Sequence, residues 1–496
     1  MSQTHHPHHL QLLLLFLLLS LTSSTPTPQK LQQGFSASPL STTTSSFQPL
    51  LTDPTSNFSL GFLRHNQNLL SLAILHVSSS QPFWLANPTH PASWSPTTLL
   101  SFFNGTLLLS DTSTNLLYWS TPTTPGDTLL LLNTSNLIIT HQNNTTPLWQ
   151  SFHIPSNTLV QDQNFTSNMS LDYYHPSSKT LYSLRLGDDF MGLFASYGSR
   201  ELLYWKRTPL EAKAEIKEGE GPIYARVNTD GYLGMYQASS KPVDVQMFNT
   251  FQQTTSFLIV RLEPDGNLRG YYWDGNNWVL NYEAITETCD FPSPCGSYGL
   301  CTPGGTGCSC LDNRTRFEPD GCFSYNGNND DNLCTEGVIS GESNNNYFVI
   351  RRSGVEPPNK ELLGFVTTTS LAECEGLCEK NCSCWGALYS NSTGFCYVLD
   401  YPVQTMVGTG DGSKVGYFKV RKEEEGKNRV RVRVGVVIAV LVGVSVVVVG
   451  VGIWIMRWRR RKGVNGIMKE ENGASPGPYK NLESASFRSI EMCNGL

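Results

Sequence analysis

Residues 256–271 read SFLIVRLEPDGNLRGY, an apolar run followed by a turn signal and a second short run. The first run has the length of a strand, and Asp-Gly between two such runs is a strong signal for a β-hairpin. Pieces of the same pattern recur at 228–236, which read NTDGYLGMY. A recurring strand–turn–strand unit indicates a repeated sheet with pseudo-symmetry.

Short strands of this kind are predicted throughout residues 25–285. This region contains no cysteine, and its apolar runs are cut by Asn, Gly, Ser, Thr and Pro, as in GTLLLSD, NLLYWST and DTLLLLN. Regular short strands with turn signals predict a mainly β fold, either a sandwich, a barrel or a prism. The net charge of −6, with 15% charged residues, gives no basic excess that would indicate nucleic acid as a partner.

Cysteine is concentrated in one part of the chain. Twelve of the 13 cysteines lie between Cys289 and Cys396, and the last is Cys493. An even, dense cluster indicates the disulfide framework of a secreted region, although spacing alone leaves the pairing open. A zinc site is the alternative, and it would be all-cysteine because the last histidine is His175. We therefore expect disulfides, with no metal and no cofactor.

The N-terminus has the pattern of a secretory signal peptide. Its apolar core, Leu12 to Leu19, is too short to cross a bilayer, and small residues follow it up to Ser24. We predict a signal peptide at 1–24, and the alternative is a buried helix of the mature fold. Cleavage at this position would leave the N-terminal side of the chain outside the cell.

A second apolar segment, 434–456, has 23 residues without a charge and is followed by basic residues and Trp458. This length and these flanks predict a single transmembrane helix in the plasma membrane, type I in orientation. A charged stalk at 421–433 would precede it, and a short cytoplasmic tail at 457–496 would follow.

Small residues recur at every fourth position of the predicted membrane helix, at Gly435, Ala439 and Gly443. Such a face allows two helices to approach closely and predicts a homodimer or a contact with a receptor kinase. The alternative is a chance arrangement in a segment rich in Val and Gly.

All acceptor sequences for N-glycosylation precede the predicted membrane helix, which agrees with a glycosylated ectodomain. They are Asn57, Asn104, Asn133, Asn143, Asn144, Asn164, Asn168, Asn313, Asn381 and Asn391.

Motifs spread over residues 30–420 resemble a plant family, the S-domain receptors with bulb-type (G-type) lectin and S-locus glycoprotein-like domains. The lectin-like motifs are NFSLGFL (57–63), FWLANPTHP (83–91), YWST (118–121) and LWQSFHIPSNTL (148–159). The cysteine motifs are CDFPSPCGSYGLC (289–301), similar to an EGF-like start, and CEGLCEKNCSCWGALYS (374–390), similar to the core of a PAN domain. Within the family the chain looks most like the kinase-less PAN domain-containing membrane proteins.

The resemblance implies four modules outside the membrane. They are a β-prism bulb-type lectin domain at 30–150, a second lectin-like (S-locus glycoprotein) domain at 155–285, an EGF-like module at 289–322 and an α+β PAN (apple) domain at 334–420. It also implies the disulfide pairs Cys289–Cys301, Cys295–Cys308, Cys310–Cys322, Cys374–Cys396, Cys378–Cys384 and Cys334–Cys382.

Bulb-type lectins bind mannose with the pattern Q-x-D-x-N-x-V-x-Y, whose five side chains share one face of a strand. Among the windows of this chain, 263–271 fits best, with Asp265, Asn267 and Tyr271 as the expected sugar contacts. It departs from the pattern at Glu263 and Arg269. The alternative is that the Asp-Gly here only forms a turn.

No constellation of residues predicts catalysis. The 40 residues after Met456 contain none of the kinase motifs G-x-G-x-x-G, H-R-D or D-F-G. We therefore expect a receptor-like protein that recognises a carbohydrate, or a protein or peptide ligand, and signals through a kinase-bearing partner. The alternatives are a wall-facing adhesion or structural glycoprotein without such a partner, and, less in keeping with the sequence, an enzyme.

Overall fold

The structure, a computed structural model, divides into two units, residues 1–422 and 423–496, which are described separately. It describes residues 27–40, 45–66, 68–142, 144, 146–176, 178–209, 223–237, 241–247, 257–304, 307–312, 314–318, 321–323, 333, 347–422 and 449–457.

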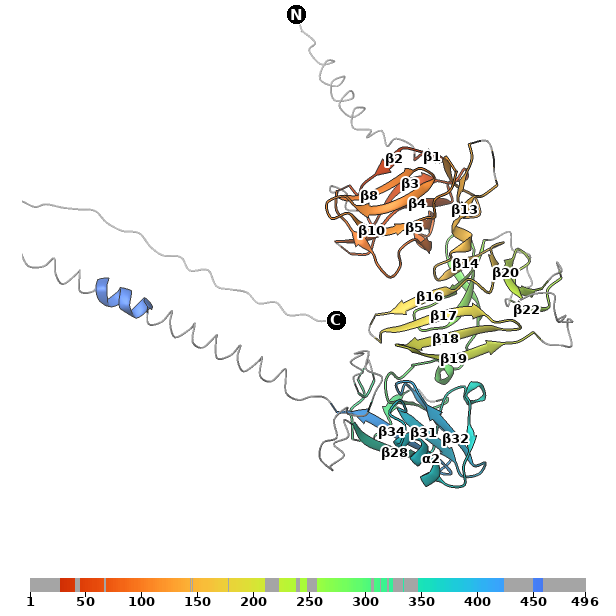
Figure 1. The fold of residues 1–496 in the computed structure, drawn as a ribbon, viewed down its shortest axis with the longest axis vertical. Coiled ribbons are helices and arrows are strands. Elements are labelled where there is room, and N and C mark those ends of the chain that lie inside the picture. Colours follow the sequence, from red (N-terminus) through yellow and green to blue (C-terminus); the bar gives the residue numbers. More distant parts are fainter. Residues whose placement is uncertain are drawn as a thin grey trace, which may run out of the picture. The chain divides into compact units, whose positions relative to one another are not determined.

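Residues 30–150 form three antiparallel sheets (Figure 1). The elements are β1 (Lys30–Gln32), β2 (Phe35–Ala37), β3 (Phe47–Thr52), β4 (Phe58–Arg64), β5 (Leu69–His76), β6 (Gln81–Leu85), β7 (Ala92–Ser93), β8 (Thr98–Phe103), β9 (Thr106–Asp111), β10 (Leu116–Ser120), β11 (Thr128–Leu131), β12 (Leu137–Thr140), β13 (Trp149–Gln150) and the 3₁₀ helix η1 (Ser151–His153). The sheet orders are β3-β4-β5-β6 with β7 beside β5, β10-β9-β8-β2, and β1-β11-β12-β13.

One tryptophan from each of these sheets joins a shared aromatic contact. Trp84 of β6 meets Trp119 of β10 and Trp149 of β13 edge to face, with centroid separations of 5.6 and 6.4 Å. The rings of Trp119 and Trp149 are 6.1 Å apart. Alternating residues such as Leu107 and Leu109 of β9 complete the core, because successive side chains of a strand point to opposite faces.

Residues 158–283 repeat the arrangement with three further four-stranded antiparallel sheets. The strands are β14 (Thr158–Val160), β15 (Asn164–Phe165), β16 (Leu171–His175), β17 (Thr180–Leu186), β18 (Met191–Tyr197), β19 (Arg200–Arg207), β20 (Tyr224–Asn228), β21 (Tyr232–Tyr236), β22 (Asp244–Met247), β23 (Leu258–Leu262), β24 (Leu268–Trp273) and β25 (Trp278–Glu283). The orders are β14-β23-β24-β25, β15-β20-β21-β22 and β16-β17-β18-β19.

The two groups of sheets are joined by specific hydrogen bonds. The indole Nε1 of Trp84 donates at 2.7 Å to the carbonyl of Ile154, which lies in the segment between the two groups. The guanidinium of Arg261 donates to Oε1 of Gln81 at 3.1 Å and to the carbonyl of Pro82 at 3.0 Å. Through Arg261, strand β23 of the second group is therefore hydrogen-bonded to strand β6 of the first group.

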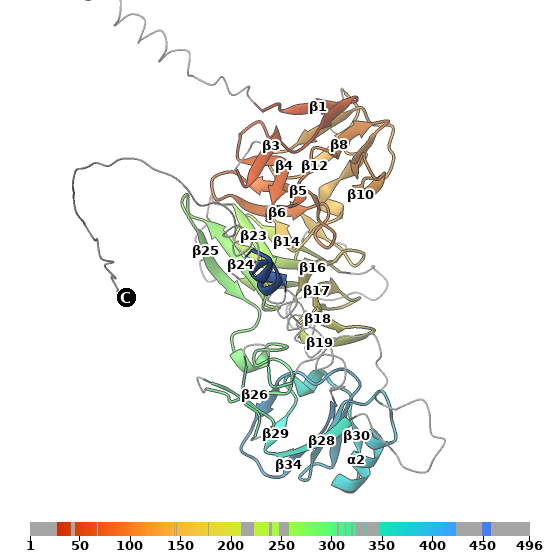
Figure 2. The ribbon, with the colours of Figure 1, turned by 90° about the vertical axis from the view of Figure 1, so that its left-hand side faces the viewer.

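The first cysteine-rich segment shares a sheet with residues that follow it by about a hundred positions. This sheet has the order β27-β26-β33-β29 and pairs Leu300 with Met406 in parallel register. Its elements, with the preceding 3₁₀ helix, are η2 (Thr288–Asp290), β26 (Gly299–Cys301), β27 (Cys308–Cys310), β29 (Val355–Glu356) and β33 (Met406–Gly408). The predicted EGF-like module is thus built into the same body as the residues assigned to the PAN domain (Figure 2).

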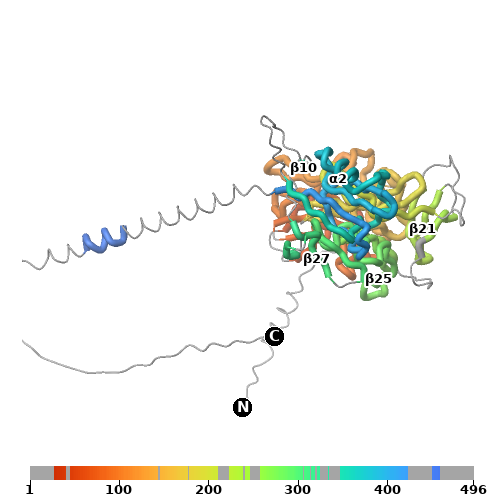
Figure 3. Tube along the Cα trace, turned by 90° about the horizontal axis from the view of Figure 1, so that it is seen from below, coloured from red at the N-terminus to blue at the C-terminus, as the bar shows by residue number. Residues whose placement is uncertain are grey.

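The last sheet has the order β28-β34-β31-β32-β30, and the helix α2 lies against β31 and β32 (Figure 1). Figure 3 shows α2 from below. The elements of this part are β28 (Tyr347–Ser353), η3 (Lys360–Leu362), β30 (Val366–Thr367), α2 (Leu371–Glu379), β31 (Gly386–Ser390), β32 (Phe395–Leu399) and β34 (Lys414–Arg421). The side chain of Ser370 accepts a hydrogen bond from the amide of Glu373 and caps the helix N-terminus.

A buried lysine fixes the other end of α2. The Nζ of Lys419 donates to the carbonyls of Cys378 at 2.8 Å and Asn381 at 3.1 Å. It also lies 4.8 Å from the centre of the Tyr347 ring. A cation near the last carbonyls of a helix is favourable, although burial lowers the pKa of this lysine.

Within the residues that the structure describes, no helix is both long and apolar enough to cross a membrane. Residues 449–457 are helical, and the rest of the predicted membrane span, 434–448, lies outside the described residues together with its small-residue face. The predicted signal peptide at 1–24, the stalk beyond Lys422 and the tail beyond Arg457 also lie outside them.

We predict that Trp84→Ala lowers the local stability of the first three sheets by about 3–5 kcal/mol, because it removes a buried indole and its bond to Ile154. Trp84→Phe, which keeps a ring but loses the bond, should cost about 1 kcal/mol. Hydrogen exchange of the β12 amides in urea measures this. The control Tyr174→Ala removes a half-exposed ring, and an effect on β12 equal to that of Trp84→Ala would contradict the prediction.

Candidate ligand-binding site

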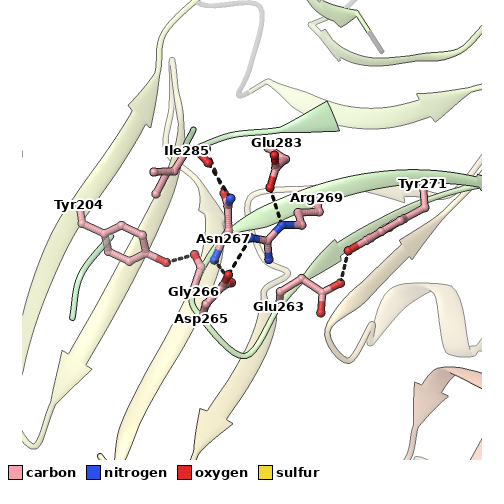
Figure 4. Close-up of polar contacts among 9 residues, drawn as sticks. All are labelled: Tyr204, Glu263, Asp265, Gly266, Asn267, Arg269, Tyr271, Glu283 and Ile285. Carbon is pink, nitrogen blue, oxygen red and sulfur yellow. Dashed lines mark hydrogen bonds and ion pairs between the residues drawn. The ribbon is translucent and has the colours of Figure 1, made fainter. Parts of the chain in front are cut away.

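The window 263–271 comprises the tight turn between β23 and β24, residues 263–267, and the first four residues of β24 (Figure 4). The amide of Glu263 donates to the carbonyl of Asn267 at 2.9 Å, and the amide of Gly266 donates to the carbonyl of Glu263 at 3.0 Å. Gly266 has φ +84°, a conformation that favours glycine. Its carbonyl accepts a hydrogen bond from the hydroxyl of Tyr204, so the tip of the turn is anchored to β19.

The side chain of Asn267 is fully buried and bonds to the main chain at the end of β25. Its Nδ2 donates to the carbonyl of Ile285 at 2.8 Å, and its Oδ1 accepts from the amide of Ile285 at 3.0 Å. Asn267 therefore ties the start of β24 to the residues after β25, and its side chain is closed to solvent.

Arg269 stands where the lectin pattern Q-x-D-x-N-x-V-x-Y has its valine, and it forms two ion pairs. Its guanidinium lies 2.7 Å from the carboxylate of Asp265 and 2.7 Å from that of Glu283. Partial burial alone would lower the pKa of Arg269, but the bonds to both carboxylates outweigh it and raise that pKa. Because 43% of the Asp265 side chain is exposed, this pair lies at the surface of the turn.

The hydroxyl of Tyr271 points toward Glu263, the first residue of the window. Its hydroxyl donates to Oε1 of Glu263 at 2.8 Å (Figure 4). Burial, together with this bond to a carboxylate, raises the pKa of Tyr271. The two residues that depart from the lectin pattern thus bind its expected sugar contacts. Glu263 accepts from the hydroxyl of Tyr271, and Arg269 pairs with the carboxylate of Asp265.

The structure therefore places Asp265 and Asn267 in one turn and Tyr271 in the strand β24 that follows it, and each already has an internal partner. Of the two interpretations left open by the sequence, this geometry favours the turn. Asp265 is the predicted contact with an exposed carboxylate, and its role in sugar binding stays a prediction.

An asparagine plays a related part in the first group of sheets, a structural role that sequence reasoning missed. The amide of Leu132 donates to the carbonyl of Asn136 at 2.9 Å, as Glu263 does to Asn267. Ser135 has φ +68° at the position of Gly266. The Nδ2 of Asn136 donates to Oε1 of Gln150 at 2.7 Å. The sequence did contain a signal for this role, since an asparagine ends both short turn sequences, NTSN (133–136) and PDGN (264–267).

The acceptor asparagines lie at the surface wherever the structure describes them. Those that are exposed are Asn57, Asn104, Asn133, Asn144, Asn164, Asn168, Asn381 and Asn391. Asn143 and Asn313 lie outside the described residues. Surface placement is what a glycan requires, and the attachment itself stays a prediction.

Five disulfides are formed by described cysteines. They are Cys289–Cys301, Cys295–Cys308, Cys310–Cys322, Cys374–Cys396 and Cys378–Cys384, the same pairs that the family resemblance implies. Cys382 is also disulfide-bonded, and its expected partner Cys334 lies outside the described residues. No group of three or more His, Cys, Asp or Glu side chains within the described part could hold a metal ion.

Two family models match the chain. One described as a D-mannose binding lectin matches residues 82–179, and one described as an S-locus glycoprotein domain matches residues 227–319. A PAN domain-containing protein of Arabidopsis thaliana is 49% identical over 467 residues, which cover 93% of this chain and 92% of that relative. The chain belongs to the plant S-domain family.

S-domain relatives with a kinase are more distant. A G-type lectin S-receptor-like serine/threonine-protein kinase of Arabidopsis thaliana is 26% identical over 396 residues, or 75% of this chain. The match spans 44% of that kinase. Among solved structures, the fetuin-binding two-domain lectin of Scilla campanulata is 17% identical and covers 52% of this chain and 94% of its own, with a TM-score of 0.19, which supports no inference.

We predict that Asn267→Ala lowers the stability of this S-domain turn by about 1–3 kcal/mol, because it leaves the amide and carbonyl of Ile285 buried without partners. Asp265→Ala should cost less, about 1 kcal/mol, since it removes a surface ion pair and one hydrogen bond to the amide of Asn267. Urea-dependent hydrogen exchange at β24 and β25 compares the two. Equal losses would show that burial of Asn267 does not stabilise the turn.

The variant Asp265→Ala can also test sugar binding without unfolding the protein. Since this variant should keep its fold, its binding to soluble mannose oligosaccharides, measured by calorimetry beside the native protein, reports on the carboxylate alone. Given its ion pair with Arg269, we expect no difference between the two proteins. A sugar that the native protein binds and the variant does not would instead establish 263–271 as a binding site.

Proposed function

We propose that the protein is a plasma-membrane receptor-like protein without a kinase. In this proposal its ectodomain recognises a carbohydrate or a protein ligand, and it signals together with a kinase-bearing partner. The observation that carries the proposal is the match of both S-domain family models to a chain whose ectodomain is also related to that of receptor kinases.

The domain assignments form part of the proposal. Two successive groups of three antiparallel sheets support a β-prism bulb-type lectin domain at 30–150 and a second lectin-like domain at 155–285. The disulfides of residues 289–322 support an EGF-like module. The five-stranded sheet with one helix, held by two disulfides, supports a PAN domain at 334–420.

A protein or peptide ligand fits the structure better than mannose. The window closest to the lectin pattern has all three expected contacts, Asp265, Asn267 and Tyr271, engaged in internal bonds or ion pairs. A lectin fold can be retained while its sugar site is lost, because the fold depends on the core and not on the polar groups of one turn.

A binding role without catalysis is supported by the lectin family model and by the PAN domain-containing relative, which matches over nearly its whole length, whereas the kinase-bearing relative matches over 44% of its length. The alternative role is a wall-facing adhesion glycoprotein that needs no signalling partner. The exposed acceptor asparagines agree with either role, since both place this part of the chain outside the cell. A stable association with a receptor kinase distinguishes the two roles.

We predict that a receptor kinase copurifies with the tagged full-length protein from plant membranes. The combined changes Gly435→Leu, Ala439→Leu and Gly443→Leu should abolish the association, because bulky residues would block close approach of two helices. The matched control carries Val436→Leu, Val440→Leu and Val444→Leu, which alter a neighbouring face with the same spacing. Mass spectrometry of the purified material identifies the kinase.

The outcomes separate the parts of the proposal. Loss from the first variant alone supports both the partner and the helix face. A kinase retained by all three proteins supports the partner but assigns the contact to the ectodomain. Absence of a kinase from all three would leave the adhesion role as the better account.

A further inference from the structure

A cluster of aromatic rings lies where the two groups of three sheets meet. We call this cluster the junction, and it consists of Phe58 (β4), His76 (β5) and Phe83 (β6) from the first group with Phe257, Trp273 (β24) and Trp278 (β25) from the second. His76 is 5% exposed, so the two groups of sheets meet around a buried histidine.

The contacts of His76 extend from one group of sheets to the other. Its ring stacks with that of Phe83 in its own group, with 5.8 Å between the ring centres. From the second group, the rings of Trp273 and Trp278 approach it edge to face, at 4.8 and 5.4 Å. Contacts of this kind suit a neutral imidazole and exclude water from it.

A chain of hydrogen bonds indicates the protonation state of this histidine. The indole Nε1 of Trp278 donates to Oγ of Ser79 at 3.0 Å, and the amide of Gln81 donates to the same oxygen at 3.4 Å. Both lone pairs of that oxygen are then engaged, so the hydroxyl hydrogen of Ser79 points to Nδ1 of His76, 2.8 Å away. Nδ1 is therefore assigned as an acceptor, which makes the ring neutral with its hydrogen on Nε2.

A proton on Nδ1 would break this chain. The nitrogen would become a donor, and it would face an oxygen that already accepts from Trp278 and Gln81. The added charge would also lie among apolar rings, away from water. Protonation of His76 therefore acts against both the hydrogen bonds and the packing that join the two groups of sheets.

Other ionisable side chains lie on the strands and turns around His76. They are Asp53, Arg64, Arg261, Glu263, Arg269, Tyr271, Tyr272, Asp274, Tyr282 and Glu283. The nearest of these to the junction in sequence, Asp274, accepts from the amides of Asn276 and Asn277 in its own turn. Among these residue types and histidine, only histidine ordinarily changes its charge between about pH 5 and 8.

We propose that His76 makes the junction between the two groups of sheets sensitive to acid. The neutral ring joins the groups through Ser79, Trp278 and the aromatic contacts, and protonation of Nδ1 weakens that connection. This inference goes beyond the proposed function and does not depend on it.

The direction of the effect follows from the burial of His76. In the unfolded chain a histidine binds its proton at about pH 6.5, whereas burial in the folded protein lowers the pKa of His76. The contribution of the neutral ring to stability is therefore complete above about pH 6.5, and it is lost as the pH falls below that value toward the folded pKa.

Hydrogen exchange of the full-length protein at pH 7 and pH 5, followed by mass spectrometry, measures the junction. Exchange rates corrected for their intrinsic pH dependence give a protection factor for each segment. We expect protection in β6, β24 and β25 to fall about fivefold or more at pH 5 and to recover at pH 7. Protection in α2 and β32, which Cys374–Cys396 links, should change by less than about twofold.

Two histidine variants identify the group that responds to pH. His76→Phe keeps an aromatic ring that cannot bind a proton, so its fall in protection should be less than about twofold. The matched control His65→Phe changes a histidine that precedes the same strand and bonds to Ser71, and it should retain the native fall. Melting temperatures at pH 7 show whether each variant is folded.

A pair of serine variants keeps the inference testable if His76→Phe does not fold. Ser79→Ala removes the link between Trp278 and His76, so protection at the junction should already be lower at pH 7. Its further fall at pH 5 should be smaller than that of the native protein, because the neutral ring has lost a bond that favours it. The matched control Ser78→Ala changes an exposed neighbour and should behave as the native protein does.

Several results would overturn the inference. Unchanged protection in the native protein would show that the junction does not respond to acid, and an equal fall in His76→Phe would assign the response to another group. An equal fall in every segment would be general acid denaturation. Protection that rises at pH 5 would show that the aromatic rings stabilise the protonated histidine. None of these results bears on kinase copurification, so the inference and the proposed function can fail separately.

Discussion

The edge-to-face contact of Trp84, Trp119 and Trp149 is the interaction on which the first domain depends. A four-stranded sheet has only one apolar face, and it must cover that face with another element. Here three small sheets cover one another, and each contributes one indole to the shared contact. Because Trp84 also bonds to Ile154, the contact extends to the chain that enters the second domain.

Polar residues that resemble ligand contacts have a structural use in this protein. Short strands leave many turns, and the main-chain groups of a buried turn need partners. Asn136 and Asn267, each directly after a residue with positive φ, bond such groups in neighbouring segments, the amide of Phe152 and the amide of Ile285. Residue types that a sugar would need therefore also hold the sheets of this chain together.

The strands and turns could largely be predicted from the sequence, because alternation and turn residues are local signals, as in residues 256–271. The register Leu300–Met406 could not, since it joins residues more than a hundred positions apart. The same limit applies to the candidate site. The pattern predicts that Asp265, Asn267 and Tyr271 share one face of a strand. The bond between Asn267 and Ile285 could not be predicted, because it depends on how β25 pairs with β24. The cysteine pairs required the family resemblance, because spacing alone leaves them open.

The position of β34 has a mechanical consequence. This strand ends at Arg421, opposite Tyr347, the first residue of β28. The chain thus enters and leaves the last sheet at neighbouring points. Tension applied beyond Lys422 acts first on the Tyr347–Arg421 pair and then on each following pair in turn. The first pairs between β28 and β34 would break one after another, at a lower force than if all broke together, until the pairs of β34 with β31, from Phe418 to Lys414, resist further opening.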